Sequence, residues 1–204
     1  MFDLDGTLYD SSHIGARLIF SRPLEAGLLF AERKTRKSLV GADYGQAEAY
    51  YREYFSRLSH TAHKPEDLLR AWYFDSFMPG MCQVLKKYYC PRPGLSELFE
   101  KLTRKSRKFA VYSDYPLVAE RLRALGLNTE DCGLLYGPEN FGAQKPAARP
   151  FLSIAEAMGI SPGEILVVGD REDTDGAGAA AAGMGFIRIK TDKDWELFQS
   201  PSQG

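Results

Sequence analysis

The chain has 204 residues, 44% hydrophobic and 26% charged, and its formal net charge is −1. Such values are typical of a globular protein that buries a real core, either as one domain or as a core with a small insert. A net charge so close to zero gives no global field that would attract nucleic acid or a membrane surface, and no run approaches the about 18 apolar residues of a membrane-spanning helix. We therefore expect neither nucleic acid nor a membrane among its partners.

The start of the chain and the cysteines predict a cytoplasmic protein. The first residues are acidic, with no basic segment or long apolar run, so we expect no secretory signal. The three cysteines are odd in number and far apart, which fits neither a disulfide framework nor a zinc site. We expect them to be reduced thiols that act as small buried apolar residues. They are Cys82, Cys90 and Cys132.

The first element is a short apolar strand that ends in two acidic residues, Asp3 and Asp5, followed at once by a Gly-Thr turn. Side chains two residues apart share one face of a strand, so both carboxylates can reach the same small volume. At about 4 Å and an effective dielectric near 20, two such charges repel by roughly 4 kcal/mol. A divalent metal next to a nucleophilic carboxylate would offset this repulsion and supply chemistry. The alternative is a solvated strand end or an Asp-stabilised turn.

This first strand is shorter than the usual five or six residues, because only Met1 precedes Phe2. Either the strand is unusually short or further residues precede Met1, and the sequence leaves both possibilities open.

Residues 12–91 are expected to be helical. Apolar side chains recur at helical spacing over residues 48–58 and again over residues 68–77, and Pro65-Glu66-Asp67 provides an acidic start for the second helix. Pro91 to Gly94 then break the chain. We expect a helical cap at residues 12–91, inserted into a core formed by residues 1–11 and 92–204.

Beyond residue 94, helices alternate with strands. This alternation predicts a Rossmann-like α/β core whose parallel sheet is covered on both faces. In such sheets the ligand crevice lies outside the carboxyl ends of the strands. The expected strands span residues 109–112, 133–136, 165–168 and 186–189, and the expected helices span residues 95–102, 117–125, 150–158 and 176–182.

Polar residues follow these strands. Ser113 comes after the second strand, Lys145 lies beyond the third, and Asp170 and Asp175 follow the fourth. Carboxylate oxygens are suitable ligands for Mg²⁺, and a lysine with a hydroxyl can hold the oxygens of a phosphoryl group. Each residue also has a purely structural alternative: a turn or helix cap for Ser113, a surface lysine, and helix-start acids for the two aspartates.

In order and spacing, these motifs resemble the haloacid dehalogenase superfamily of aspartyl-phosphate phosphotransferases, and in particular its phosphoglycolate phosphatase-like members with a helical cap. The resemblance covers most of the chain. It implies a Rossmann-like core, an inserted helical cap and Mg²⁺ as cofactor. It rests on Asp3-x-Asp5-Gly6-Thr7, Ser113, Lys145 and Gly169-Asp170-x-x-x-x-Asp175.

The resemblance also implies catalytic roles for the matching residues. Asp3 would be the nucleophile that takes the phosphoryl group, and Lys145 would balance negative charge around it. Asp5 would be the general acid for the leaving alcohol and then the base for water. An acid near neutral pH needs a raised pKa, towards which neighbouring negative charge would push Asp5. Thr7 and Ser113 would help to place Asp5 and the phosphoryl oxygens.

For the metal, the resemblance implies that Asp170 binds Mg²⁺ together with Asp3 and the backbone carbonyl of Asp5. Asp175 would hold metal-bound water or contact the residues that bind the metal rather than the metal itself. Asp173 is a poor substitute because its spacing from Asp170 does not match the motif. Four aspartates against Mg²⁺ and one lysine leave the loaded site close to neutral, so that it can accept a phosphate dianion.

The expected function is Mg²⁺-dependent hydrolysis of a small phosphate monoester, such as a sugar phosphate, phosphoglycolate or a nucleoside monophosphate. A different residue usually stands at the position of Asp5 in members that act on carbon–halogen bonds, which favours phosphorus chemistry. The alternatives are a phosphomutase with the same residues, or a catalytically silent member that binds a phosphorylated ligand or a protein. Neither the exact substrate nor the oligomeric state follows from the sequence.

Four further features are explained by solvent exposure or simple packing. His60 and His63 lie three residues apart in a polar, loop-like segment without a third ligand, so we expect no metal there. His13 is expected at the surface, with the entrance to the site as its alternative. The basic run of residues 33–37 is expected to be a solvated helix face, with recognition of an acidic substrate tail as its alternative. The tyrosines of residues 44–54 are expected in the cap core, although one of them could stack on a substrate ring.

Overall fold

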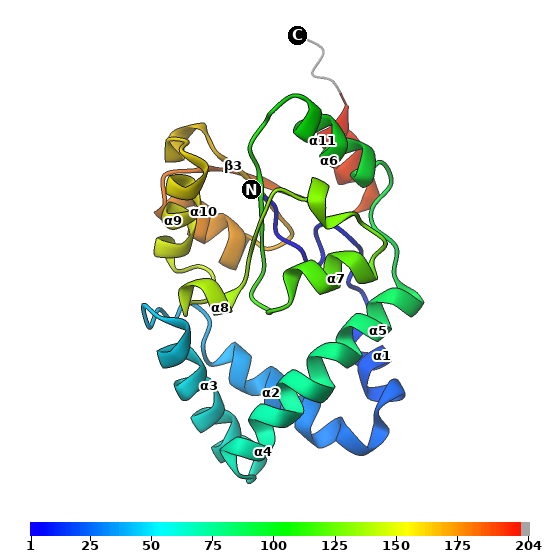
Figure 1. Cartoon of the computed structure of the whole chain (residues 1–204), viewed down its shortest axis with the longest axis vertical. Helices are drawn as coiled ribbons and strands as arrows, with labels where there is room; N and C mark the ends of the chain where they lie inside the picture. The colour runs from blue at the N-terminus through cyan, green and yellow to red at the C-terminus, as the bar shows by residue number, and fades with distance from the viewer. Residues whose placement is uncertain (201–204) are drawn as a thin grey trace.

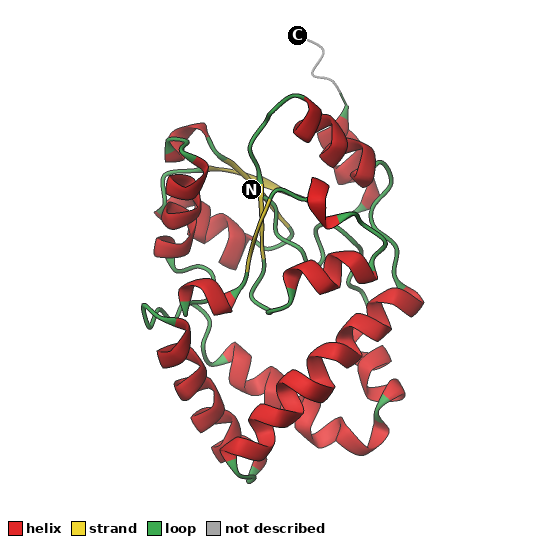
Figure 2. Ribbon diagram, in the orientation of Figure 1, coloured by secondary structure: helices red, strands yellow, loops and turns green. Residues whose placement is uncertain are grey.

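The computed structural model describes residues 1–200 and places a layer of helices beside a sheet that is flanked by further helices (Figure 1). The strands are short and lie in the centre of the sheet-containing part, with helices on either side of them (Figure 2). The strands are β1 (Ala110–Tyr112), β2 (Leu134–Tyr136), β3 (Leu166–Gly169) and β4 (Gly185–Arg188).

All strand pairs of this sheet are parallel. β1 pairs with β2, with Val111 opposite Leu135, and β3 pairs with β4. Phe2 joins the two pairs because it bridges Val111 on one side and Val168 on the other, both in parallel. The spatial order is therefore β2, β1, the first residues of the chain, β3 and β4. The opening segment occupies the central position, as a single bridging residue that is shorter still than the short strand we expected.

Helices cover both faces of the sheet, as the alternating pattern predicted. Phe2, Val111 and Val168 pack into one hydrophobic core, whereas Ala110 and Tyr112 pack into the other. The first face is covered by α6 (Leu95–Arg104), α7 (Val118–Ala124) and α11 (Asp192–Gln199), and the second by α9 (Ala148–Met158) and α10 (Ala177–Ala181), with α8 (Pro138–Phe141) near the helical layer. The α/β fold class with its covered parallel sheet is thus confirmed.

The helical layer has an aromatic core of its own. Tyr54, Phe55 and Tyr73 pack edge to face, with ring centroids 5.2–5.7 Å apart, a geometry that aromatic pairs prefer. The layer lies inside the insert that the sequence predicts. It consists of α1 (Ile14–Ser21), α2 (Ala26–Lys37), α3 (Ala47–Ala62), α4 (Glu66–Ala71) and α5 (Met78–Tyr88), with a π-helical segment at Trp72–Phe77 that makes α4 and α5 one continuous rod.

Two local expectations were wrong. Of the three cysteines only Cys132 is buried, whereas Cys82 is half-buried and Cys90 is exposed. His60 lies in the last turn of α3 rather than in a loop, and His63 caps that helix in a left-handed conformation with φ 53°. Within residues 1–200, no helix combines the length and the apolar character that crossing a bilayer requires.

Candidate active site

The predicted site residues lie at the carboxyl ends of the central strands. Lys145 links two of them, since its Nζ donates to Asp3 Oδ1 at 2.6 Å and to Asp175 Oδ1 at 2.8 Å. All three side chains are at most 9% exposed. Asp3 and Lys145, which are 142 positions apart in the chain, therefore meet with Asp175 in one buried cluster.

Tight backbone turns allow this convergence. Gly6 has φ +93°, a conformation that L side chains rarely adopt, and a Cβ there would clash with the Asp170 carboxylate. A Cβ at Gly169 would clash with Asp175 in the same way. The buried Arg92 braces the first loop by donating to the carbonyl oxygens of Thr7 at 2.7 Å and Gly6 at 3.0 Å.

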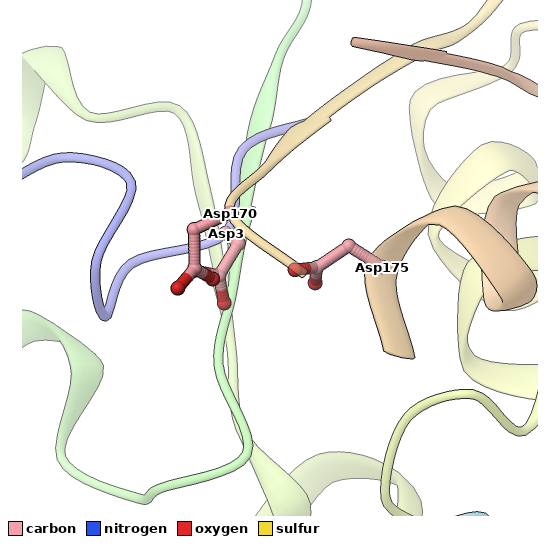
Figure 3. A group of neighbouring side chains, drawn as sticks. All are labelled: Asp3, Asp170 and Asp175. Carbon is pink, nitrogen blue, oxygen red and sulfur yellow. The ribbon is translucent and has the colours of Figure 1, made fainter. Parts of the chain in front are cut away.

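Asp3, Asp170 and Asp175 form an acidic cluster in which one oxygen from each lies within 4.8 Å of the others (Figure 3). Burial, and then the Asp175 charge, raises the pKa of Asp170 to about 6. Burial raises the pKa of Asp3 despite the opposing effect of Lys145, and the neighbouring carboxylates act in the same direction as burial. One lysine therefore does not neutralise the cluster. Three hard oxygen donors with excess negative charge are a donor set that fits Mg²⁺.

Lys145 remains cationic in this setting. Burial alone would lower its pKa, but the Asp175 and Asp3 carboxylates raise it well above the ordinary value. The Lys145 backbone N–H donates to Asp114 Oδ1 at 2.9 Å, which fixes the lysine next to the β1 end. The ammonium group is thus a permanent charge beside Asp3.

Asp5 faces a different set of partners. Its Oδ1 accepts from Tyr9 Oη at 2.6 Å and from the Arg121 guanidinium, and its Oδ2 accepts from Ser113 Oγ at 3.0 Å. Burial would raise the pKa of Asp5, but Arg121 and the hydrogen bonds outweigh it and lower that pKa. The expectation that neighbouring negative charge raises the pKa of Asp5 was therefore wrong.

Thr7 also differs in part from its expected contact. Its Oγ1 donates to Asp3 Oδ2 at 2.9 Å, so this fully buried hydroxyl orients the expected nucleophile rather than Asp5. Ser113 does contact Asp5, as described above. Asp173, the poor substitute, is exposed and pairs with Arg171 at 2.6 Å, away from the acidic cluster.

Arg121 is the residue that sequence reasoning missed. It lies on α7 with its side chain fully buried. Val118, Arg121, Leu122 and Leu125 follow the i, i+3, i+4, i+7 spacing of a buried helix face. A charged residue at a buried position of such a helix indicates that its side chain has a polar partner in the interior.

The sequence profile of a hydrolase family, the haloacid dehalogenase-like hydrolases, matches residues 1–183. The chain belongs to this family. A glyceraldehyde 3-phosphate phosphatase of Methanopyrus kandleri is 30% identical over 203 residues, which cover 95% of this chain and 84% of that protein. A phosphoglycolate phosphatase of Aquifex aeolicus is 29% identical over 207 residues, which cover 94% and 87%.

Solved structures of this family share the fold. A 2-haloacid dehalogenase from Pseudomonas syringae superposes with a TM-score of 0.61 at 21% identity, covering all of this chain and 88% of that one. A HAD-type hydrolase from Bacillus subtilis, whose structure is bound to magnesium, gives 0.62 at 18% identity and covers 97% and 96%.

In this HAD-like hydrolase a cavity of about 600 Å³ opens between the helical layer and the sheet, next to Asp5 and Asp170. It continues past side chains of α1, α2 and α5, most of them apolar, and His13 lies on its wall. A smaller cavity of about 70 Å³ is lined by Asp3, Lys145 and the other acidic residues. The large cavity therefore has room for an organic group whose reacting end reaches the acidic cluster.

Arg36 of α2 lines both cavities. Its guanidinium lies 4.5 Å from the ring centroid of Tyr115, and its Nε lies 3.5 Å from the buried Glu32 carboxylate. Within the basic run Arg36 is half-buried, whereas its three basic neighbours are exposed, so the solvated-face expectation was wrong at this position. The exposed Arg33 also lines the large cavity. Tyr50, Tyr51 and Tyr54 are buried in the aromatic core as expected, and it is Tyr9 and Tyr115 that line the large cavity.

Proposed function

We propose that this HAD-like hydrolase is a Mg²⁺-dependent phosphatase that hydrolyses a small phosphate monoester through an aspartyl-phosphate on Asp3. The observation that carries the proposal is the buried Lys145 ammonium on Asp3 inside the Asp3–Asp170–Asp175 cluster. Two relatives that are named as phosphatases support it, and this chain matches both of them over most of their length.

The chemistry divides into two displacements at phosphorus. An Asp3 oxygen attacks phosphorus while the bond to the alcohol oxygen breaks, and the departing oxygen takes a proton from Asp5. Asp5 must be protonated for this step, against the lowered pKa that Arg121 and the hydrogen bonds give it. Water then attacks the phosphoryl group and loses a proton to Asp5, and the bond to the Asp3 oxygen breaks. Lys145 holds its positive charge beside Asp3 throughout, where charge changes in both steps.

Mg²⁺, when bound, would offset the charge of the phosphoryl oxygens and keep them aligned for attack. The residues that would hold it are Asp3, Asp170 and the Asp5 carbonyl, with Asp175 close by. The inference for these side chains rests on their oxygen donors and on the excess negative charge of the cluster.

We propose a small phosphorylated metabolite as substrate, in keeping with the relatives named for glyceraldehyde 3-phosphate and phosphoglycolate. The dehalogenases among the similar structures share the fold at low identity. Asp5 offers an acid and base group in hydrogen-bonding reach of Ser113 and Tyr9, which favours phosphate ester hydrolysis.

The test is phosphate release from p-nitrophenyl phosphate with and without Mg²⁺, followed by a panel of phosphorylated metabolites. We expect release that requires Mg²⁺. A need for a bisphosphate activator with conversion of substrate but no free phosphate would indicate the phosphomutase instead. Absence of any turnover in a folded, Mg²⁺-supplied protein would contradict the proposal and favour a silent binding member.

Asp170→Asn should weaken Mg²⁺ binding by about 10- to 100-fold, because it removes a charged oxygen donor from the cluster. Isothermal titration calorimetry with Mg²⁺, together with the Mg²⁺ dependence of the rate, measures this. Asp173→Asn is the matched control, since Asp173 lies three residues after Asp170 but is exposed and pairs with Arg171. Equal Mg²⁺ affinity in the two variants would remove Asp170 from the metal site.

Gly15→Phe should raise KM for p-nitrophenyl phosphate by about tenfold, equivalent to about 1.4 kcal/mol of binding. Gly15 lines the large cavity, and a Cβ there meets no atom within 4 Å, so the new ring can enter the cavity without shifting the backbone. Acetyl phosphate, whose leaving group is small, should be less affected.

Gly27→Phe is the control for this variant, because Gly27 is also an open helical glycine but lies outside the cavity wall. Both replacements favour helix over glycine and should leave the fold intact. If Gly15→Phe matches Gly27→Phe on both substrates, the leaving group does not occupy this cavity.

A further inference from the structure

Arg121 is buried at a place where an apolar side chain would suit the fold. It is fully buried between Val118 and Leu122 on the inner face of α7, and its Nε has no hydrogen-bond partner among the described residues. Burying a guanidinium costs several kcal/mol unless good partners compensate, and well-packed apolar residues often serve stability equally well. The reason for this arginine must therefore be sought in what it contacts.

Its contacts converge on one functional group. One Arg121 nitrogen pairs with Asp5 Oδ1, and the other donates to Ser113 Oγ at 2.9 Å, while Ser113 Oγ itself donates to Asp5 Oδ2 at 3.0 Å. Tyr9 Oη adds a bond to Oδ1 at 2.6 Å. Three donors from three separate segments thus hold both oxygens of one carboxylate.

Arg121 contacts Asp5 from outside the cavities of the site. Asp5, Tyr115 and Arg36 contribute to the walls of the cavities at the acidic cluster, whereas Arg121 is not among the described residues that line them. Its guanidinium lies 5.5 Å from the Tyr115 ring centroid. Substrate in these cavities would meet Asp5 but not the group that fixes it.

We propose that Arg121 is a positioning residue for Asp5: its forked guanidinium fixes the Asp5 carboxylate and the Ser113 hydroxyl in the orientation that proton transfer needs. This inference rests on the proposed phosphatase function. Planar, two-pronged contact of this kind orients a partner more strictly than a point charge does. Loss of Arg121 should therefore slow the step in which Asp5 acts as a base. It should have little effect of its own when Asp5 is already replaced.

p-Nitrophenyl phosphate separates the two steps. Its leaving group is a weak base that departs without an added proton, so formation of the aspartyl-phosphate tolerates a misplaced Asp5. Hydrolysis of the aspartyl-phosphate requires Asp5 to accept a proton from water, and general base catalysis contributes typically about 10²- to 10⁴-fold. Arg121→Met should keep the rate constant of the first-turnover burst of p-nitrophenol within about threefold of wild type. It should lower the steady-state rate at least about 100-fold.

Three comparisons test the assignment. Arg121→Lys keeps the charge but loses the fork, and should give an intermediate steady-state rate with an unchanged burst. Arg123→Met removes an exposed arginine of the same helix and should behave as wild type. In an Asp5→Asn background, Arg121→Met should change the residual rate by less than about twofold, because coupled residues are not additive.

The inference is overturned if Arg121→Met or Arg121→Lys lowers burst and steady state by the same factor, as a purely structural role would. It is also overturned if Arg121→Met costs as much in the Asp5→Asn background as in wild type. Arg121→Lys decides the matter if Arg121→Met does not fold. An inactive wild type would overturn the proposed function itself, whereas an active wild type with additive variants would overturn this inference alone.

Discussion

Asp3→Asn is expected to abolish phosphate release from p-nitrophenyl phosphate, with a loss of at least about a thousandfold. The amide cannot form the aspartyl-phosphate, and loss of a nucleophile typically removes most of the catalysis. The same change should leave stability equal or higher, because Asp3 is buried among carboxylates that raise its pKa. Rate and thermal unfolding of the same preparation measure both effects.

The control for this substitution is Asp10→Asn, which changes an aspartate of the same N-terminal segment whose side chain accepts only from the Ser12 N–H in an exposed turn. It should keep wild-type activity. Retained activity in Asp3→Asn would refute the nucleophile assignment, and a joint loss of activity and stability would show that Asp3 is required for folding instead.

Lys145→Met is expected to lower both activity and stability. It removes the cation that bridges Asp3 and Asp175 at 2.6 and 2.8 Å. Breaking a buried ion pair on one side typically costs about 3–5 kcal/mol of unfolding free energy, because the remaining charges lose their partner. The steady-state rate should fall by about two orders of magnitude, the scale of losing one preorganised electrostatic contact.

Chemical denaturation and phosphate release measure these two losses, with the exposed Lys34→Met as control. The Asp3→Asn/Lys145→Met double variant should regain part of the stability, because one of the two unpaired carboxylates is then neutral. A stable and active Lys145→Met protein would show that the ammonium is not needed beside Asp3. Lys145→Met should thus lower stability whereas Asp3→Asn should not, although both substitutions lower activity.

Most elements of the core follow from local patterns. The helix ending before Gly126 is one example, since that glycine has φ +87° and follows the C-cap of α7. The fully apolar run of residues 165–168 becomes β3 within one residue. Apolar periodicity, glycines and prolines act over a few residues, so they can be interpreted without the fold. The opening segment is the exception, because Phe2 gains its central place from neighbours on both sides that are far away in the chain.

The sequence by itself determined the α/β class, the helical insert as a prediction, and which polar residues stand at strand ends. These are properties of spacing, and parallel strands bring their carboxyl ends to one edge. Only the tertiary structure decided that Asp5 meets Arg121, 116 residues away, and that Arg36 turns inward from a basic run. Periodicity shows which helix face is buried, but the partner of a charged side chain on that face depends on how distant segments pack.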